Sequence, residues 1–411
     1  MNFRHYRTRA VGFVAIFSVS ATVLAGCSGF QSSVTASRRL TPKPVALPPV
    51  KASTSVPALV PKQATSSPCS SSIDIGKWSS DRMAAQMLAV SANGGALSNI
   101  SQAVRYGVGG VVLMGNSSSS SLGTAIANLK QTALGDVAPI FMADEEGGGI
   151  QGLSALVSSM PWPRSMARTM TISQVEDLSY RVGQGMRSLG VDMDLAPVVD
   201  LDAGPGPSMT NPDGSRSFSA DPTITVQYAR AFVAGLEKAG ITAVIKHFPG
   251  LGGAASNTDF AAAATLPYSR LVVTGMIPFK QLATDVKAVM ISNASVPGLT
   301  GATPASLSPR AVSILRNVVG FNGMIISDSL ETVSISSYQA DLSKAAVESA
   351  EAGVDMVMLA SSNPNQMANF LAARLALSQA IGSVAFPRSA AEASVGRILA
   401  LKGFPPSCIY Y

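Results

Sequence analysis

Short apolar runs rich in β-branched residues alternate with helix-like segments over most of the chain, and this alternation constrains the fold more than any other feature. Helix-like stretches between the runs include residues 173–190 and 223–240. Strands that alternate with helices are typical of a parallel α/β fold. The seven runs are GVGGVVLM (107–114), APIFMAD (138–144), VDMDLAPVVDL (191–201), ITAVIKHF (241–248), KAVMISNASV (287–296), GMIISDS (323–329) and VDMVMLA (354–360).

Seven recognisable strands within residues 69–411 fit one eight-stranded (β/α)8 barrel of the TIM type, with insertions, better than two small domains. An open doubly wound sheet is the alternative. In a barrel, catalytic residues lie at the C-terminal ends of the strands. Polar side chains stand at such ends here: Asp144 follows PIFMA, Lys246 and His247 follow TAVI, and Asp328 follows MIIS. The sequence therefore predicts an active site at that face of the barrel.

The basic character of the chain is confined to its N-terminal part. The 411 residues carry a formal net charge of +6, but residues 1–68 hold eight of the 30 Lys and Arg and no Asp or Glu. Residues 69–411 therefore hold 22 basic and 24 acidic side chains, a charge of −2. Because the predicted domain has no basic excess, we do not expect a nucleic acid partner.

The first 26 residues have the organisation of an export signal. Arg4, Arg7 and Arg9 precede the apolar run VGFVAIFSVSATVLA, which is too short to span a membrane comfortably. The run ends in LAGC, which resembles the bacterial lipobox and implies cleavage before Cys27 and lipidation of that residue. An ordinary secretion signal that happens to contain a cysteine is the alternative. We expect an exported protein, lipid-anchored at the outer face of the cytoplasmic membrane in the cell envelope.

Residues 27–68 are rich in Ser, Thr, Pro, Ala and Lys and show no helical or strand period, which predicts a disordered tether. The predicted domain then spans residues 69–411, with Cys69 and Cys408 near its two ends. Disulfides persist in exported proteins. Our hypothesis is a Cys69–Cys408 disulfide, and the alternative is two unpaired thiols.

The residue inventory excludes several kinds of chemistry. A Ser-His-Asp triad would need His247, the only histidine besides His5, and no GxSxG motif is present. Apart from the lipidated Cys27, the expected mature chain holds one histidine and two cysteines, which argues against a zinc site, so no metal is expected. GLGGAA (250–255) matches a dinucleotide-binding pattern, but Pro249 precedes it and no acid lies about twenty residues on, so no cofactor is expected. Carboxylates remain, and a pair of them suits glycoside hydrolysis.

Six motifs resemble those of glycoside hydrolase family 3 and follow the family's order between about residues 80 and 360. The subgroup that they resemble most is the single-barrel β-N-acetylglucosaminidases acting on peptidoglycan fragments. The resemblance implies a monomeric carbohydrate-active enzyme. The motifs are ADEEGGGIQGL (DQEGGRVxRL in the family), LGVDMDLAPVVDL (GxNxxFAPVxDV), SRSFSADP (RSFGxDP), IKHFPGLG (KHFPGHG), TPASLSP (PASLS) and GFNGMIISDSLET (FxGxxxSDSLEM).

The resemblance assigns roles to the residues at matching positions. Asp328 matches the nucleophile, which forms a covalent glycosyl-enzyme and retains the anomeric configuration. Its alternative role is that of a helix N-cap, because SDSLE is typical of a helix start. Asp144, Arg216, Lys246 and His247 match positions that hold the sugar hydroxyls and the N-acetyl group. For His247, the alternative is a histidine satisfied within the core.

The acid/base loop departs from the family pattern. In the subgroup, KHFPGHG is followed four residues later by Asp-Ser-His, whose histidine is the general acid/base and whose aspartate orients it. The same spacing here gives Asn257-Thr258-Asp259. The further departures are Leu251 and Asn293 in place of histidines, and Gly149 and Gly152 in place of arginines.

Two interpretations of Asp259 follow. Burial can raise the pKa of a carboxyl group towards about 6, which would make Asp259 the general acid/base. Alternatively, Asp259 only shapes the loop, and the chain is an impaired pseudo-hydrolase that binds cell-wall glycan or a protein partner. We favour a retaining hydrolase that removes terminal β-linked N-acetylglucosamine, or a related sugar, from cell-wall glycan or its fragments. A different glycosidic substrate class or a transglycosylating enzyme is also compatible with the motifs.

Overall fold

The computed structural model describes residues 72–93, 95–361 and 365–411, and they contain an eight-stranded parallel sheet in the order β10–β9–β8–β7–β4–β3–β2–β11. A parallel bridge between Ile326 and Met356 joins its two ends, so the sheet is a nearly closed barrel. The predicted (β/α)8 fold is confirmed, and the open doubly wound sheet is wrong. The strands are β2 (Leu88–Asn93), β3 (Gly110–Met114), β4 (Ile140–Ala143), β7 (Met193–Asp194), β8 (Thr242–Phe248), β9 (Ala288–Ile291), β10 (Met324–Ser327) and β11 (Val357–Leu359).

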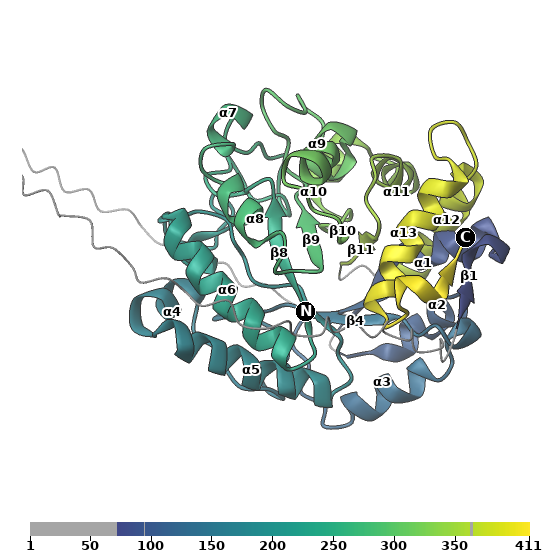
Figure 1. Ribbon diagram of the computed structural model, residues 1–411, viewed down its shortest axis with the longest axis horizontal. Helices are drawn as coiled ribbons and strands as arrows, with labels where there is room; N and C mark the ends of the chain where they lie inside the picture. Colours follow the sequence, from purple (N-terminus) through teal and green to yellow (C-terminus); the bar gives the residue numbers. More distant parts are fainter. Residues whose placement is uncertain (1–71, 94, 362–364) are drawn as a thin grey trace, which may run out of the picture. The chain divides into compact units, whose positions relative to one another are not determined.

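Helices cover the outside of the barrel (Figure 1). Side chains define where the two longest begin: Thr171 and Gln174 form a capping box on α5, and Asp221 caps α6 with Pro222 at its first position. The principal helices are α1 (Ser80–Gln86), α3 (Leu122–Lys130), α5 (Ile172–Ser188), α6 (Pro222–Lys238), α8 (Met276–Leu282), α9 (Pro309–Ser313), α11 (Leu342–Glu351), α12 (Gln366–Ala380) and α13 (Arg388–Leu401).

Each of the seven apolar runs contains a barrel strand, whereas the eighth strand, β2, was not predicted from the sequence. Only Met87 separates β2 from the preceding helix α1. Because the residues from the end of the helix into the strand are all buried, and apolar apart from Gln86, the sequence carries no turn signal at the boundary.

Strand β7 pairs over only two residues, and this irregularity positions part of the site. Pro197 has no N–H to donate to a ladder. The chain nevertheless stays beside β8, since Val199 N–H donates to the Lys246 carbonyl at 2.8 Å and Val198 bridges to Lys246. As a result, Asp200 lies next to His247.

The two ends of the described domain lie together, because β1 (Ile73–Asp74) pairs in parallel with β12 (Ile409–Tyr410). Cys408 is buried directly before β12. Its proposed partner Cys69, the lipidation site Cys27, the signal at 1–26 and the tether at 27–68 lie outside the described residues, so these remain predictions.

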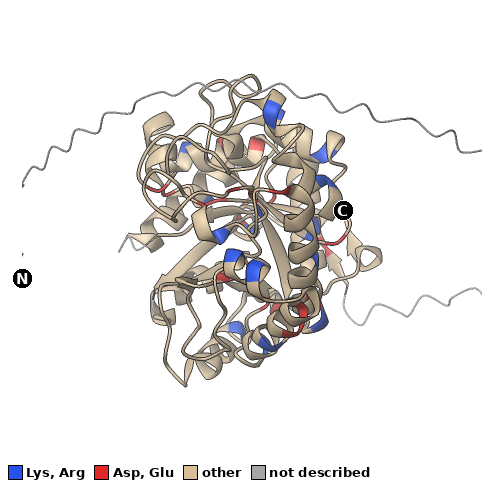
Figure 2. Ribbon diagram, turned by 90° about the vertical axis from the view of Figure 1, so that its left-hand side faces the viewer, with Lys and Arg blue, Asp and Glu red and all other residues tan. Residues whose placement is uncertain are grey.

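Lys and Arg are interspersed with Asp and Glu over the described part of the chain, as Figure 2 shows for one view of the ribbon. Within the same ranges, no helix combines the length and the apolar character needed to cross a membrane.

Candidate active site

A cavity of about 580 Å³ lies at the C-terminal ends of the barrel strands. Its lining includes residues at the ends of β3, β4, β8, β10 and β11. The six residues predicted to do chemistry or hold sugar all line it, namely Asp144, Arg216, Lys246, His247, Asp259 and Asp328. The structure thus brings together every predicted catalytic and sugar-holding residue.

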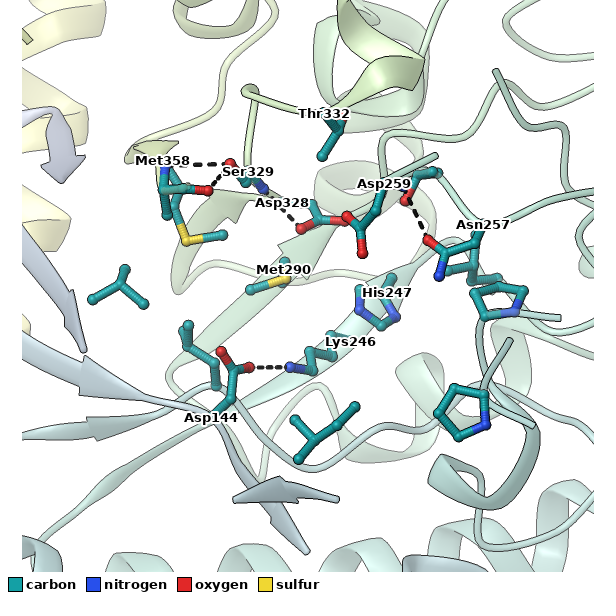
Figure 3. A pocket seen from close by; sticks show the side chains of 18 of the residues that line it. Asp144, Lys246, His247, Asn257, Asp259, Met290, Asp328, Ser329, Thr332 and Met358 are labelled. Carbon is teal, nitrogen blue, oxygen red and sulfur yellow. Dashed lines mark hydrogen bonds and ion pairs between the residues drawn. The ribbon is translucent and has the colours of Figure 1, made fainter. Parts of the chain in front are cut away.

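The floor of the cavity is an ion-pair network centred on Glu146. Lys246 Nζ donates to Asp144 Oδ1 at 2.6 Å and lies 2.7 Å from Glu146 Oε1 (Figure 3 shows the first contact). Arg216 donates two parallel hydrogen bonds of 2.8 Å each, from Nε and Nη2, to the carboxylate of the same Glu146. Such bidentate pairs fix the orientation of a guanidinium group. Glu146 was not singled out from the sequence, and the only available signal was its place among three consecutive acids after β4.

The pKa shifts within this network keep Glu146 and Lys246 ionised. Burial alone would raise the pKa of Glu146, but Arg216 and then Lys246 outweigh it and keep that pKa well below the usual range. Burial alone would likewise lower the pKa of Lys246, but Asp144 and Glu146 raise it above its ordinary value. Both partners therefore stay ionised, and Lys246 presents a fixed ammonium group to the cavity.

Glu146→Gln is expected to lower the free energy of unfolding by about 3–5 kcal/mol, because it leaves two buried cations without a full partner. The side chains of Glu146, Lys246 and Arg216 are only 1%, 3% and 13% exposed. Urea denaturation of the described domain measures the change.

Asp285→Asn is the matched control. It breaks an ion pair with Arg230 of the same 2.8 Å length, but those side chains are 31% and 50% exposed. It should cost less than about 1 kcal/mol. Equal losses for the two variants would contradict the structural role given to Glu146.

His247 is held by Asp200. His247 Nδ1 lies 2.7 Å from Asp200 Oδ2, which also accepts the backbone N–H of His247 at 3.0 Å. Asp200 Oδ1 accepts the N–H of Leu251 at 2.6 Å. The carboxylate thus fixes the ring through Nδ1 and leaves Nε2 for the cavity. His247 is therefore more than a satisfied core residue, since it is both buried and part of the cavity wall.

Asp328 directly follows β10 and is not a helix cap. The N-cap of α10 (Val333–Tyr338) is Thr332, whose side chain accepts the N–H of Ile335. The Asp328 carboxylate accepts only the N–H of Ser329, at 2.7 Å, among the contacts that the structure describes, and it faces the cavity. Its N-cap alternative is therefore wrong, and one oxygen remains open toward the cavity.

Asn293 supports the segment that follows Asp328. Its Nδ2 donates to the Ser329 carbonyl at 2.6 Å, and its Oδ1 accepts from Ser306 Oγ at 2.6 Å. The residue that replaces a family histidine here is thus a fully buried structural amide.

Asp259 lies on a loop whose turn is made by Asn257. The Asn257 side-chain oxygen accepts the N–H of Asp259 at 2.9 Å, while Ser334 N–H anchors the intervening Thr258 carbonyl at 3.0 Å. Asp259 as a whole is exposed, yet its carboxyl group faces the cavity and points toward Asp328 (Figure 3). Because Asn257 shapes the turn, the carboxyl group of Asp259 is not needed for it.

The surroundings raise the pKa of Asp259 above that of an ordinary aspartate. Withdrawal of the carboxyl group from water raises its pKa, and the negative charge of Asp328 raises it further, against the opposing effects of Arg216 and His247. The neighbouring Phe260 is not the cause of this pKa shift, since its side chain is 56% exposed. A carboxyl group whose pKa is raised in this way is suited to general acid catalysis.

The remaining departures from the family pattern are explained by packing. Leu251 packs with three buried alanines in a small apolar cluster, in the place of a histidine. A Cβ on Gly152 would lie 2.9 Å from the Gly115 carbonyl oxygen, and one on Gly149 would lie 3.0 Å from the Trp162 ring. Arginines at these two positions would require the chain to rearrange.

Asp200, Asp213 and His247 are the one group within the described ranges whose ligand atoms lie close enough, within 4.8 Å of one another, to hold a metal ion. However, both oxygens of Asp200 already accept hydrogen bonds from His247 or Leu251. Burial, reinforced by the charge of Asp200, raises the pKa of Asp213 well above the ordinary value, and a neutral carboxyl group is a poor ligand. The arrangement favours a hydrogen-bonded Asp–His pair, and we assign no metal to it.

A (β/α)8 barrel with two carboxyl groups facing one charged cavity at its strand ends is the arrangement found in (β/α)8-barrel glycosidases. The chain belongs to glycoside hydrolase family 3: the family model "Glycosyl hydrolase family 3 N terminal domain" matches residues 81–401. The family predicted from the motifs is confirmed.

Relatives agree with this assignment. The chain is 34% identical over 311 residues to "Beta-hexosaminidase LpqI" of Mycobacterium tuberculosis, covering 74% of this chain and 78% of the relative. It is 31% identical over 266 residues to a β-hexosaminidase of Alkalilimnicola ehrlichii, covering 61% and 73%.

Solved structures are similar as well. M. tuberculosis LpqI superposes with a TM-score of 0.72 at 33% identity, covering 80% of this chain and 96% of that one. A family 3 glycosyl hydrolase from Mycobacterium smegmatis gives 0.73 at 30% identity, covering 80% and 98%. The chain is therefore a β-hexosaminidase-like glycosidase of this family.

Proposed function

We propose that the chain is a retaining glycoside hydrolase that removes terminal β-linked N-acetylglucosamine, or a related sugar, from cell-wall glycan or its fragments. The observation that carries the proposal is the pair formed by Asp328 and Asp259, which face each other in one cavity and differ in environment. A glycosidase needs one ionised carboxylate and one protonated carboxyl group.

In the first step, Asp328 attacks the anomeric carbon while Asp259 gives its proton to the departing glycosidic oxygen. A covalent glycosyl-enzyme results, and Asp259 is left as a carboxylate. In the second step, Asp259 takes a proton from water, the water oxygen attacks the anomeric carbon, and Asp328 leaves as a carboxylate. Two displacements at one carbon retain the configuration.

Four residues of the cavity floor and wall hold the sugar in this proposal. Lys246 and Arg216 donate charge-assisted hydrogen bonds to hydroxyl or N-acetyl oxygens, and Asp144 accepts hydroxyl protons. His247 uses Nε2, because Asp200 occupies Nδ1. The ion pairs around Glu146 keep these groups in place before the substrate arrives, which lowers the cost of ordering them.

A pseudo-hydrolase that binds cell-wall glycan or a protein partner through the same cavity is the second candidate. The absence of the family's Asp-Ser-His from the loop favours it. Assaying the chain without its predicted signal peptide on 4-nitrophenyl N-acetyl-β-glucosaminide separates the two. Nitrophenol release supports the hydrolase, whereas binding of N-acetylglucosamine without any release supports the pseudo-hydrolase.

We further propose an exported monomer, anchored in the cell envelope by a lipid on Cys27 and closed by a Cys69–Cys408 disulfide. The order of the N-terminal signal supports the anchor, and the adjacency of β1 and β12 is compatible with the disulfide. Intact mass, measured after alkylation with and without prior reduction, tests the disulfide. If Cys69 and Cys408 were both alkylated without reductant, the disulfide would be contradicted.

A further inference from the structure

Glu145 lies between two acids of the cavity floor but does not line the cavity itself. It begins β5 (Glu145–Gly147), which pairs antiparallel with β6 (Ile150–Gln151). Asp144 and Glu146 line the cavity, whereas Glu145 does not, because successive side chains of an extended chain point to opposite sides. The same short segment therefore turns two acids toward Lys246 and buries a third acid behind them.

Glu145 shares this buried region with Asp194 of β7, and both residues are 0% exposed. The backbone N–H of Glu145 donates to Asp194 Oδ1 at 3.0 Å, and Glu145 Oε1 accepts the N–H of Leu153 at 2.7 Å. The first bond joins β5 to β7, and the second joins β5 to the chain that follows β6. Glu145 therefore closes the open end of the β5–β6 hairpin, which also carries Glu146.

Neither buried acid has the partners that an ionised carboxylate requires. One oxygen of each, Glu145 Oε2 and Asp194 Oδ2, has no hydrogen-bond partner in the described part of the chain. The charged side chains that act on the two acids are Asp144, which is itself an acid, and Lys246, which is already paired with Asp144 and Glu146. A buried carboxylate without a cation of its own loses its hydration and gains little in return, so the neutral acid is the stable form.

The pKa shifts of the two acids agree with these contacts. Burial, and then the charge of Asp144, raise the pKa of Glu145 to about 8 against the opposing effects of the Leu153 N–H and the Gln151 amide. Burial also raises the pKa of Asp194 well above its ordinary value, and the charge of Glu145 adds to that shift. Both groups therefore carry a proton at neutral pH.

We propose that Glu145 is a positioning residue that holds the Glu146 hairpin as a neutral acid, and that its ionisation at alkaline pH weakens sugar binding. A neutral acid offers one donor and one acceptor, as an amide does, and the family motif DQEGGRVxRL has glutamine at this place. An ionised Glu145 would put an unpaired buried charge behind Glu146, and relieving it requires the hairpin to open toward water. Glu146 would then orient Lys246 and Arg216 less well. The part that concerns sugar rests on the proposed function.

Urea denaturation of the unaltered chain and of Glu145→Gln between pH 5 and pH 9 tests the neutral acid. In the unfolded chain Glu145 ionises near its ordinary pKa, whereas in the folded chain it stays neutral up to about pH 8. The unfolding constant of the unaltered chain, divided by that of Glu145→Gln, should therefore rise about tenfold per pH unit from about pH 5 to pH 8 and level off above. A ratio that is the same at every pH would overturn the proposal.

Glu146→Gln is the matched control. Glu146 adjoins Glu145 and is similarly buried, but Arg216 and Lys246 hold it ionised. Its replacement should change the unfolding constant by a factor that stays constant from pH 6 to pH 9, because Glu146 is ionised there in both the folded and the unfolded chain. A rise with pH as steep as that for Glu145→Gln would overturn the assignment of the pH dependence to Glu145.

Calorimetric titration of N-acetylglucosamine at pH 6 and pH 9 tests the positioning role. If binding requires neutral Glu145, the Kd of the unaltered chain relative to that of Glu145→Gln should rise about tenfold, since pH 9 lies about one unit above the pKa of Glu145. Both chains keep Asp259, so its ionisation cancels from this ratio. An unchanged ratio would overturn the positioning role. Absence of binding by both chains at pH 6 would contradict the proposed function together with that role, whereas the unfolding measurement decides the neutral acid independently.

Discussion

Asp328→Ala is expected to reduce glycoside hydrolysis by about 10⁴-fold or more, the loss typical of removing a covalent nucleophile. Asp328 directly follows β10, and its carboxylate is committed to one backbone N–H while the rest of the group faces the cavity. Asp144, which follows β4 in the same way, is instead ion-paired to Lys246, and the buried Glu146 is paired to Lys246 and Arg216.

Release of nitrophenol from 4-nitrophenyl N-acetyl-β-glucosaminide measures this loss. Asp285→Ala serves as a control, since that residue pairs with Arg230 outside the cavity lining and should leave turnover unchanged. Turnover that survives Asp328→Ala would show that another group attacks the sugar. The stability of the variant, followed by urea denaturation, separates lost chemistry from lost folding.

Asp259→Asn is expected to reduce hydrolysis of a poor leaving group by about 10²–10⁴-fold, the usual contribution of general acid catalysis. The loss on an activated aryl glycoside should be much smaller in the first step, because a nitrophenolate departs without a proton. The measurement is kcat/KM across aryl glycosides of rising leaving-group pKa. The logarithm of kcat/KM should fall more steeply with leaving-group pKa for the variant than for the unaltered chain. Equal slopes for the two would show that Asp259 is not the general acid.

The raised pKa of Asp259 also predicts how activity on a poor leaving group depends on pH. Because burial and Asp328 raise the pKa of Asp259, its acid form persists to higher pH than that of an ordinary aspartate. Activity on a poor leaving group should fall as the pH rises through this raised pKa, since ionised Asp259 has no proton to give. The Asp259→Asn profile should lack that limb, and an unchanged alkaline limb would contradict the assignment.

Sequence patterns predicted the positions of the site residues well because one rule covers them. Asp144, Lys246, His247 and Asp328 lie at or just after the ends of barrel strands, and parallel strands bring those ends to one face. Alternation of strand and helix patterns was enough to predict the barrel. Order along the chain and spacing within motifs then predicted Arg216 and Asp259 as members of the same cavity.

The residues missed from the sequence depend on contacts between distant segments. Glu146 pairs with Arg216, 70 positions along the chain, and Asp200 holds His247 across 47 positions. An acid in a strand-end motif does not reveal which cation it meets. The change from histidine to Leu251 was visible, but the apolar cluster that accommodates it was not.

The most direct test of the account is to trap the covalent intermediate and locate it. A fluorinated N-acetylglucosaminyl fluoride, which forms the glycosyl-enzyme faster than it is hydrolysed, is incubated with the chain, and the adduct is mapped by peptide mass spectrometry. The account predicts one added sugar on the peptide that contains Asp328, absent from Asp328→Ala. An adduct on a different residue, or release of fluoride with no adduct at any time, would contradict it.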